Sequence, residues 1–491
     1  MVFNNSILAG SSTQEEDVYE IAQSILFDDS HPAYMRRTPS SASNKRTWTY
    51  SLWIKRADQP ANYSPGMLLL QHGNSGTGLQ ETIRINTASG STHSTLMYYS
   101  DSPSSNLTTT QVLRDGASWY HIVVAKDTTQ STASDRVKIY INGQRVTSFS
   151  TETYPSLNGE GFINSNVLHN ISADQNGGSN YDGYMAEMHF IDGSQLDPSS
   201  FGKTNSKGIW VPIEYEGSYG TNGWHIDGRD SGDLGDDESG NGNDWATTNL
   251  VAADQAPDTP TNNFTIMNIL DNYPHQGAFS KGNLQIVSFQ TSYHSHTSTM
   301  GLKRGKWYAE IKWTAQGTSP SGYYSNTFFG IVGSVDTTSS IGVGTRSDSY
   351  CYIGTTAGSG EDGGKKRNNA TASAYGADYA VGDIVGIALD LDNNKIYWSK
   401  NGTFQNSGNP TSGSTGTGSA FDLTTPSSGF YYFAVSDQHG DSSSTWQINF
   451  GSAPPYTISS GNADGNGYGN FEYAVPSGYY SVCTKNISEF G

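Results

Sequence analysis

The fold is decided first by residues 47–55, which read TWTYSLWIK. Bulky side chains stand at every second position from Trp48 to Ile54, and Trp53 adds one to the alternate set. Alternation with a period of two is typical of a β-strand, because successive side chains of a strand point to opposite faces. The stretch therefore predicts a strand with bulky residues on both of its faces.

The same period returns in both halves of the chain. Dipeptides such as Asn142-Gly143 and Asp192-Gly193 separate the runs and are typical of tight turns. The expected strands are 82–85, 95–99, 120–125, 137–141, 184–191, 284–289, 307–313, 327–332, 384–389, 395–399, 431–436 and 446–450. Strands joined by turns, without helical periods between them, indicate antiparallel sandwiches.

These patterns predict an all-β fold with two tandem antiparallel jelly-roll-type β-sandwich domains and short terminal attachment segments. We expect an N-terminal attachment segment at 1–22, sandwiches at 23–226 and 257–452, an acidic Gly-rich linker at 227–256 and a C-terminal segment at 453–491. Residues 13–16 fit a helix capping box. Residues 24–27 fit either a helix or a strand, and the local pattern leaves both open.

Composition narrows the function. The 491 residues include 27 Lys and Arg against 46 Asp and Glu, which gives a formal net charge of −19. This balance excludes an electrostatic nucleic-acid binder, because an acidic protein repels the phosphate backbone. Aromatic residues make up 12% of the chain, which argues against disorder because large apolar side chains offset the entropy cost of ordering.

The cysteines and the apolar runs indicate the cellular compartment in which the chain folds. Cys351 and Cys483 match neither a metal-binding spacing nor a disulfide framework, so we expect folding in a reducing cytoplasm. The first residues lack the basic and apolar regions of a signal peptide. No apolar run approaches the roughly 18 residues of a membrane span, so no membrane insertion is expected.

Three motifs in the first half resemble a laminin G-like (concanavalin A-like) domain. WTYSLWIK at 48–55 is similar to its early strand, and GYMAEMHF at 183–190 to its closing strand. WYHIVVA at 119–125, followed by VKIYING at 137–143, is similar to its hairpin. The resemblance implies a lectin-like sandwich and favours the strand interpretation of residues 24–27.

Motifs in the second half resemble a SPRY domain. GKWYAEI at 305–311 is similar to its start, and INFG at 448–451 to its end. GDIVGIALDLD at 382–392 and IYWSKNG at 396–402 resemble its central hairpin. The resemblance implies partner binding through loops at one end of the sandwich, here 293–299, 347–351 and 437–443.

The two domains, with SGNGND at 239–244 between them, resemble tail or surface proteins of marine bacteriophages. This implies a virion protein that is assembled in the host cytoplasm and released by lysis. Its expected partners are other virion proteins and a host cell-surface glycan or protein. A fibre protein is expected to be a homo-oligomer such as a trimer, although no heptad run supports a coiled coil.

Two groups of residues could bind a metal. Asp236, Asp237, Asn241, Asn243 and Asp244 place several oxygen ligands in one loop, which suits calcium. A solvated linker with good turn residues is the favoured interpretation of this loop, and no other cofactor is expected. His294 and His296 would share one strand face, but no third ligand is identifiable, and exposed polar histidines are the commoner case.

Aromatic side chains are the best candidates for ligand contacts, because sugar rings stack on flat apolar faces. The candidates are Tyr98, Tyr99 and Asp101 in the first sandwich and Tyr293, His294, His296, Tyr350 and Tyr352 in the second. The alternative is that these tyrosines fill sheet faces.

No catalytic motif is visible in the sequence, and Glu187 alone supplies a carboxylate on its strand face where a glycosidase needs a pair. The sequence therefore predicts a non-enzymatic virion protein, a tail fibre or receptor-binding adhesin that contacts host glycans. The alternatives are a capsid decoration or tail-assembly protein and, less favoured, a glycan depolymerase.

Overall fold

The computed structural model describes residues 19–57, 66–73, 79–87, 94–271, 277–288, 294–317, 326–334, 342–355, 363–437 and 443–491. The chain divides into an N-terminal domain that ends at Thr261 and a C-terminal domain that begins at Asn262. Both are antiparallel β-structures, as the sequence predicts. Within the described ranges, no helix is long and apolar enough to cross a membrane.

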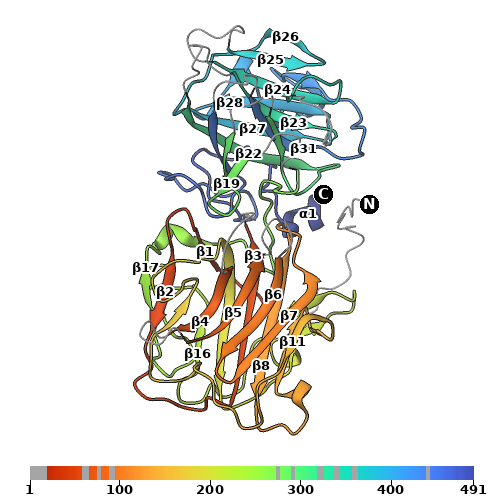
Figure 1. Ribbon diagram of the computed structural model, residues 1–491. Helices are drawn as coiled ribbons and strands as arrows, with labels where there is room; N and C mark the ends of the chain where they lie inside the picture. Colours follow the sequence, from red (N-terminus) through yellow and green to blue (C-terminus); the bar gives the residue numbers. More distant parts are fainter. Residues whose placement is uncertain are drawn as a thin grey trace. The chain divides into compact units, whose positions relative to one another are not determined.

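Two eight-stranded sheets form the body of the N-terminal domain (Figure 1). Sheet A has the order β10 (Gln144–Arg145), β9 (Val137–Ile141), β8 (Trp119–Asp127), β3 (Thr47–Arg56), β13 (Gly183–Asp192), β1 (Ser24–Phe27) and β18 (Gln255–Ala256), and β16 (Trp224–Ile226) also pairs with β13. Sheet B has the order β11 (Phe149–Thr153), β7 (Ser104–Val112), β6 (Ser94–Asp101), β5 (Gln80–Thr87), β4 (Met67–Gly73), β12 (His169–Ile171), β2 (Tyr34–Arg37) and β17 (Ala246–Thr248). Short 3-10 turns lie at Ala133–Asp135, Pro198–Ser200 and Ala252–Asp254.

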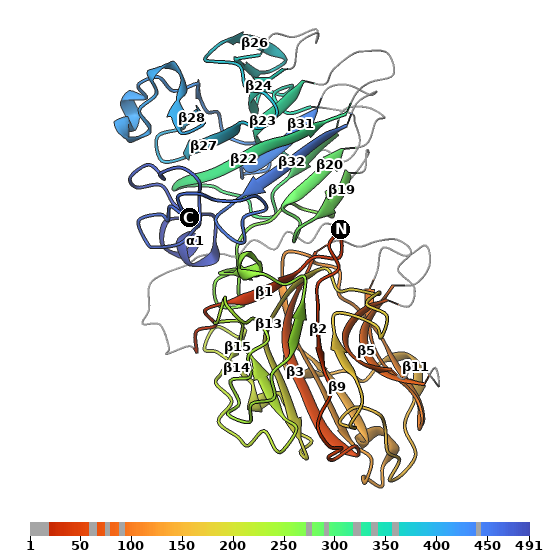
Figure 2. The same cartoon turned by 90° about the vertical axis from the view of Figure 1, so that its left-hand side faces the viewer.

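Strand β3 shows why the fold forms. Its even-numbered positions from Trp48 to Ile54 lie in the core between the sheets. Trp53 points to the opposite face and stacks on His121, with 4.8 Å between ring centroids. That outer face of sheet A carries the hairpin β14 (Gly202–Thr204) and β15 (Trp210–Pro212) (Figure 2). Trp210 Nε1 of this hairpin donates to His121 Nδ1 at 3.1 Å. Strand β3 is therefore buried on both faces, as expected.

The strand interpretation of Ser24–Phe27 is correct, since β1 pairs with β13 and β18. The expected linker at 227–256 is wrong, because this stretch completes the first sandwich. Its strands β17 and β18 pair with β2 and β1, and its Leu234 and Trp245 are buried in the core. The glycines and acidic residues form turns between these buried apolar residues. The composition of the stretch therefore does not reveal that Leu234 and Trp245 belong to the core. The capping box at 13–16 lies outside the described residues.

Two further sheets form the C-terminal domain. Sheet C has the order β19 (Gly277–Ser280), β20 (Gln285–Ser288), β32 (Ser444–Asn449), β22 (Lys306–Gln316), β27 (Ile384–Asp390), β28 (Lys395–Lys400) and β29 (Thr403–Phe404), and β30 (Phe421–Asp422) also pairs with β28. Sheet D has the order β21 (His294–Thr297), β31 (Tyr432–Asp437), β23 (Thr327–Val332), β24 (Ser349–Gly354), β25 (Lys365–Asn368) and β26 (Thr371–Ala374). Short 3-10 turns lie at Gln405–Ser407 and Pro410–Thr415. The core between the sheets includes four fully buried tryptophans, Trp307, Trp313, Trp398 and Trp446.

The C-terminal segment 453–491 packs on its own domain. Phe471 and Tyr479 are buried against Tyr308 and Tyr397, which lie on β22 and β28. The segment ends in α1 (Thr484–Phe490), which begins after the buried Cys483.

Candidate functional site

Strand periodicity places three of the candidate tyrosines in the cores. Tyr98 is fully buried and its hydroxyl donates to Glu81 Oε1 at 2.7 Å. Tyr350 and Tyr352 are buried in the second core, and the Tyr352 hydroxyl donates to the Ala377 carbonyl. These three residues are unavailable to a ligand, so the alternative interpretation, that tyrosines fill sheet faces, is the right one for them.

The expected histidine pair also differs from the structure. His296 is fully buried between the sheets, 5.5 Å from the Phe279 ring and 6.3 Å from Trp446 between centroids. This aromatic setting makes it a core residue rather than an exposed ligand. His294 pairs with Asp437 through the backbone, while its side chain and all of Tyr293 lie outside the described residues.

Tyr99 and Asp101 do lie on a surface, the outer face of sheet B. The Tyr99 hydroxyl donates to Asp101 Oδ1, and this hydrogen bond, followed by partial burial, raises the pKa of Tyr99. The Arg84 guanidinium lies over the Tyr99 ring, 5.7 Å from its centroid. Asp101 Oδ2 also accepts from the Gln80 amide at 2.9 Å, which fixes the carboxylate.

A second arginine–tyrosine pair lies on the same face. Arg36 covers the Tyr34 ring at 4.4 Å, and its Nε donates to Asn170 Oδ1 at 3.0 Å. Met35 between them points into the core, so Tyr34 and Arg36 point outward. Strands β6 and β2 are separated by β5, β4 and β12, which places the two pairs about 19 Å apart at the usual strand spacing. We call the face that carries both pairs the sheet B platform.

The loop expected to bind calcium is organised by hydrogen bonds. Asp237 Oδ1 accepts from the amides of His225 and Ser239 at 2.8 and 2.9 Å, and its Oδ2 accepts from the Asn243 amide at 2.7 Å. Asn241 and Asn243 donate their side-chain amides to backbone carbonyls of 220–223. The Asp237 oxygens that calcium would need are thus occupied, and the geometry favours the turn interpretation. Asp236 is half-buried, and Asp244 Oδ1 accepts from the Asp237 amide at 3.2 Å.

We expect Asp237→Ala to destabilise the N-terminal domain by about 1–3 kcal/mol, because buried amides lose a charged acceptor. Calorimetry with and without calcium measures this effect. The melting temperature of the wild-type protein should be the same in both conditions. A calcium-dependent rise that Asp237→Ala removes would restore the calcium interpretation.

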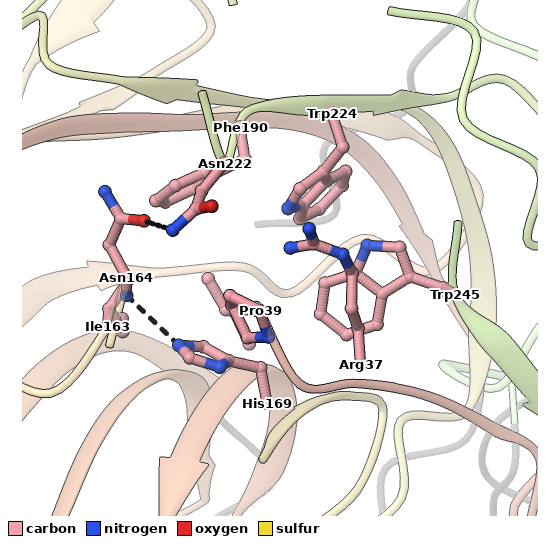
Figure 3. Close-up of a pocket in the computed structure, with 10 residues that line it drawn as sticks. Arg37, Pro39, Ile163, Asn164, His169, Phe190, Asn222, Trp224 and Trp245 are labelled. Carbon is pink, nitrogen blue, oxygen red and sulfur yellow. Dashed lines mark hydrogen bonds between the residues drawn. The ribbon is translucent and has the colours of Figure 1, made fainter. Parts of the chain in front are cut away.

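A pocket of about 260 Å³, including the solvent at its mouth, lies in the N-terminal domain. Figure 3 shows Arg37, Trp224 and Trp245 on one side and Asn164 and Asn222 on the other. The asparagines bond to each other at 2.9 Å, and the Asn164 amide donates to His169 Nε2 at 3.1 Å. Burial lowers the pKa of His169 to about 3, so its ring is the neutral acceptor that this bond requires. The polar groups at this pocket bond internally, which indicates a structural role.

A cluster of Glu187, His189 and His225 lies on the outer face of sheet A. Both imidazole Nε2 atoms face Glu187 Oε2, at 3.3 Å from His189 and 3.0 Å from His225. Burial lowers the pKa of His189 to about 4. Burial acts to raise the pKa of Glu187, but hydrogen bonds from the two histidines outweigh it, so the pKa is lowered.

Sequence reasoning treated Glu187 only as a lone carboxylate and missed the cluster. The spacing of Glu187 and His189 within one strand was a usable signal. His225 lies on another strand, and only the pairing of β16 with β13 brings it alongside His189.

The C-terminal domain has a polar groove of about 380 Å³, including open solvent. Its lining includes Asp271, Ser295, Thr297, Arg346 and Ser349. Thr297 donates to Asp271, and Arg346 donates to Ser334 Oγ at 3.4 Å. Such a groove suits polar groups of a partner better than an apolar ligand.

Comparison with known families agrees with both domains. Residues 31–197 match the concanavalin A-like lectin/glucanases superfamily, and residues 306–446 match the SPRY domain. The chain therefore carries a concanavalin A-like domain followed by a SPRY domain, both of them folds associated with carbohydrate or protein binding.

Individual relatives are distant. The ATP-dependent RNA helicase DDX1 of Xenopus laevis is 29% identical over 110 residues, which are 22% of this chain and 12% of the helicase. The SPRY domain of human HERC1 has a TM-score of 0.26 and 16% identity over 35% of this chain and 91% of its own. A candidate carbohydrate binding protein from Bacteroides ovatus has a TM-score of 0.29 and 14% identity over 48% of this chain and 60% of its own.

Proposed function

We propose that the protein is a non-enzymatic bacteriophage virion protein, a tail fibre or receptor-binding adhesin that contacts host surface glycans. The observation that carries the glycan part is the sheet B platform on a domain of the lectin class. The bacteriophage part is supported by the sequence resemblance. In this proposal the protein is assembled in the host cytoplasm and leaves with the virion at lysis.

The platform offers two kinds of contact that sugars require. Tyrosine rings present flat apolar area, while Asp101 presents an acceptor and Arg36 presents donors for hydroxyl groups. The two pairs lie about 19 Å apart and act as separate contacts, because Thr82, Gln71 and Asn170 between them on this face are buried. Each contact is weak, so copies of the chain, as in a homo-trimer, would act together through avidity.

Binding of host polysaccharide to the purified protein tests this proposal. We expect Tyr99→Ala to weaken binding about fivefold to tenfold, which corresponds to about 1–1.4 kcal/mol of lost ring contact. Tyr99→Phe is the matched control, because it keeps the ring and removes only the hydroxyl, so it should bind more tightly than Tyr99→Ala. Host adsorption and glycan arrays that detect no binding by the wild-type protein would refute the glycan role.

The second candidate is a capsid decoration or tail-assembly protein that binds other virion proteins. The polar groove beside sheet D favours it, since Ser295, Thr345 and Arg346 at this groove offer hydrogen-bonding groups to a protein partner. Cryo-electron microscopy of the particle distinguishes the two candidates, because an adhesin lies at a tail tip, whereas a decoration protein lies on the head and a tail-assembly protein lies within the tail. A depolymerase would instead release reducing ends from host polysaccharide, and we expect none.

A further inference from the structure

Glu187 is placed by a β-bulge in β13. Ala186 pairs with Trp53 and His189 pairs with Ser51. Two residues of β13, Glu187 and Met188, therefore lie opposite one residue of β3, Leu52. Met185 points into the core, and regular alternation would therefore send Glu187 into the core as well. The bulge turns Glu187 to the outer face of sheet A, on the same side as His189.

This placement is strained. Glu187 has φ +47°, in the left-handed region that costs a residue with a side chain about 1–2 kcal/mol. Strain of this kind persists where the surrounding structure imposes it, and it is concentrated at functional sites. The bulge and the strain together bring one carboxylate to two imidazoles.

Pairing of β16 with β13 places His225 directly across from His189. Their rings stack with 4.1 Å between centroids and 14° between planes. His189 Nδ1 lies 2.9 Å from the Tyr219 hydroxyl. Once a metal ion displaces the Nε2 proton, this hydroxyl can accept a hydrogen bond from Nδ1–H and so hold the Nε2 lone pair toward the ion. This is the arrangement in which an outer partner orients a metal-binding histidine.

Glu187 is almost completely buried and is asymmetrically bonded. Its Oε2 faces both histidines and the Tyr19 hydroxyl, which donates at 3.3 Å. Among the described residues, its Oε1 has no hydrogen-bond partner. A buried carboxylate oxygen without a partner costs about 1–3 kcal/mol, and a cation that Glu187 binds through both of its oxygens would remove that cost.

We propose that Glu187, His189 and His225 form a binding site for a divalent transition-metal ion, Zn²⁺ in the first instance. One candidate ligand atom from each residue lies within 4.8 Å of the others. A tetrahedral zinc ion with bonds of about 2.0–2.1 Å separates its ligand atoms by about 3.3 Å. The observed separations from Glu187 Oε2 are 3.0 and 3.3 Å.

Two imidazoles and one carboxylate suit Zn²⁺ rather than calcium, which prefers oxygen ligands. Binding would displace the protons that the histidines share with Glu187 and leave a fourth coordination position for water. This site goes beyond the proposed glycan role. It lies on sheet A, opposite the sheet B platform of the same domain, so either proposal can fail without the other.

The test is titration of the metal-free full chain with Zn²⁺ by calorimetry and with Co²⁺ by visible absorption. We expect one ion per chain, a raised melting temperature and a tetrahedral cobalt spectrum, none of them displaced by excess calcium. Tyr219→Phe should weaken binding about 10- to 100-fold, because it removes only the orienting partner. His225→Ala should abolish binding, whereas His31→Ala, at an exposed position outside the cluster, should leave it unchanged.

Wild-type protein that binds no Zn²⁺ would overturn the proposal without any variant, and so would equal binding by wild type and His225→Ala. Loss of binding in His31→Ala would place the ion elsewhere and also overturn it. Circular dichroism checks that each variant is folded. If His225→Ala does not fold, the cobalt spectrum of the wild type and the affinity of Tyr219→Phe decide the question.

Discussion

Replacing Lys126 by Met is expected to lower the free energy of unfolding of the N-terminal domain by about 3–5 kcal/mol. Lys126 Nζ lies 2.6 Å from Glu81 Oε1, and both side chains are fully buried. Removing the ammonium group leaves the Glu81 carboxylate as an uncompensated charge in the core. For a domain of 150–250 residues, this corresponds to a melting temperature lower by about 6–20 °C.

The carboxylate cannot rearrange to avoid this cost, because it is held on all sides. Glu81 Oε1 also accepts from the Tyr98 hydroxyl, and its Oε2 accepts from the amides of Phe162 and Ile163 at 2.6 and 2.7 Å. Burial acts to raise the pKa of Glu81, but Lys126 and these donors outweigh it and hold the pKa below its ordinary value. The pair therefore contributes stability above the ordinary carboxyl pKa and loses it as the pH falls toward the lowered value.

Differential scanning calorimetry measures the shift, and only the N-terminal transition should move. The double variant Glu81→Gln/Lys126→Met should recover much of the loss, because the buried charge is gone while an acceptor for the two amides remains. Lys45→Met is the matched control, since it breaks the partly exposed bridge to Glu160. If Lys45→Met and Lys126→Met lower the melting temperature equally, burial does not explain the importance of the Lys126–Glu81 pair.

The second large effect is expected from Glu310→Ala, which should release the C-terminal segment 453–491. Glu310 accepts from the amides of Glu472 and Tyr473 at 2.9 and 2.8 Å and from the Tyr456 hydroxyl at 3.0 Å. The Tyr308 hydroxyl donates to it at 3.1 Å. Hydrogen bonds to a charged group contribute about 1.5–3 kcal/mol each. Loss of even two of the bonds between Glu310 and the segment would therefore raise the undocked population at least about 100-fold.

Hydrogen exchange across 453–491 and limited proteolysis measure this release. Glu489→Ala, an exposed change in the same segment, should have no effect on either. Release of the segment by both variants would mean that Glu310 is not the anchor.

Acidification provides an independent check. Burial raises the pKa of Glu310, so the folded domain binds this proton more readily than the unfolded chain does. The contribution of Glu310 to stability is therefore greatest at low pH and is lost as the pH rises through the raised pKa. Lowering the pH from neutral toward that value should leave the segment docked. Its release on mild acidification would contradict this assignment.

Much of the fold could be predicted from the sequence because burial on sheet faces leaves a period of two. That pattern identified β3 and both sandwiches, and the resemblance resolved β1. The same rule could have separated Tyr98 from Tyr99, since adjacent strand residues cannot both face a core. Of the two, Tyr98 lies in the core and Tyr99 lies outside it.

The remaining features depend on contacts between distant residues. The stretch around Asp237 has the composition of a solvated linker. In the structure its carboxylate accepts hydrogen bonds from backbone amides, and the sequence does not reveal such bonds. The bulge that turns Glu187 outward is an irregularity that periodicity cannot reveal. The proximity of His225 to His189 exists only once β16 pairs with β13.

The strands contributed by residues 246–256 bear on how the chain folds as it is synthesised. Strand β1 precedes the other described strands in the chain, and it has both of its neighbours, β13 and β18, only when residues up to 256 have been synthesised. Until then β1 and β2 are exposed edges that can pair with other nascent chains. A fragment that ends at 197, where the superfamily match ends, lacks β17 and β18. Its β1 and β2 would therefore remain exposed edges. We expect the fragment 19–261, which keeps β17 and β18, to be monodisperse when it is expressed.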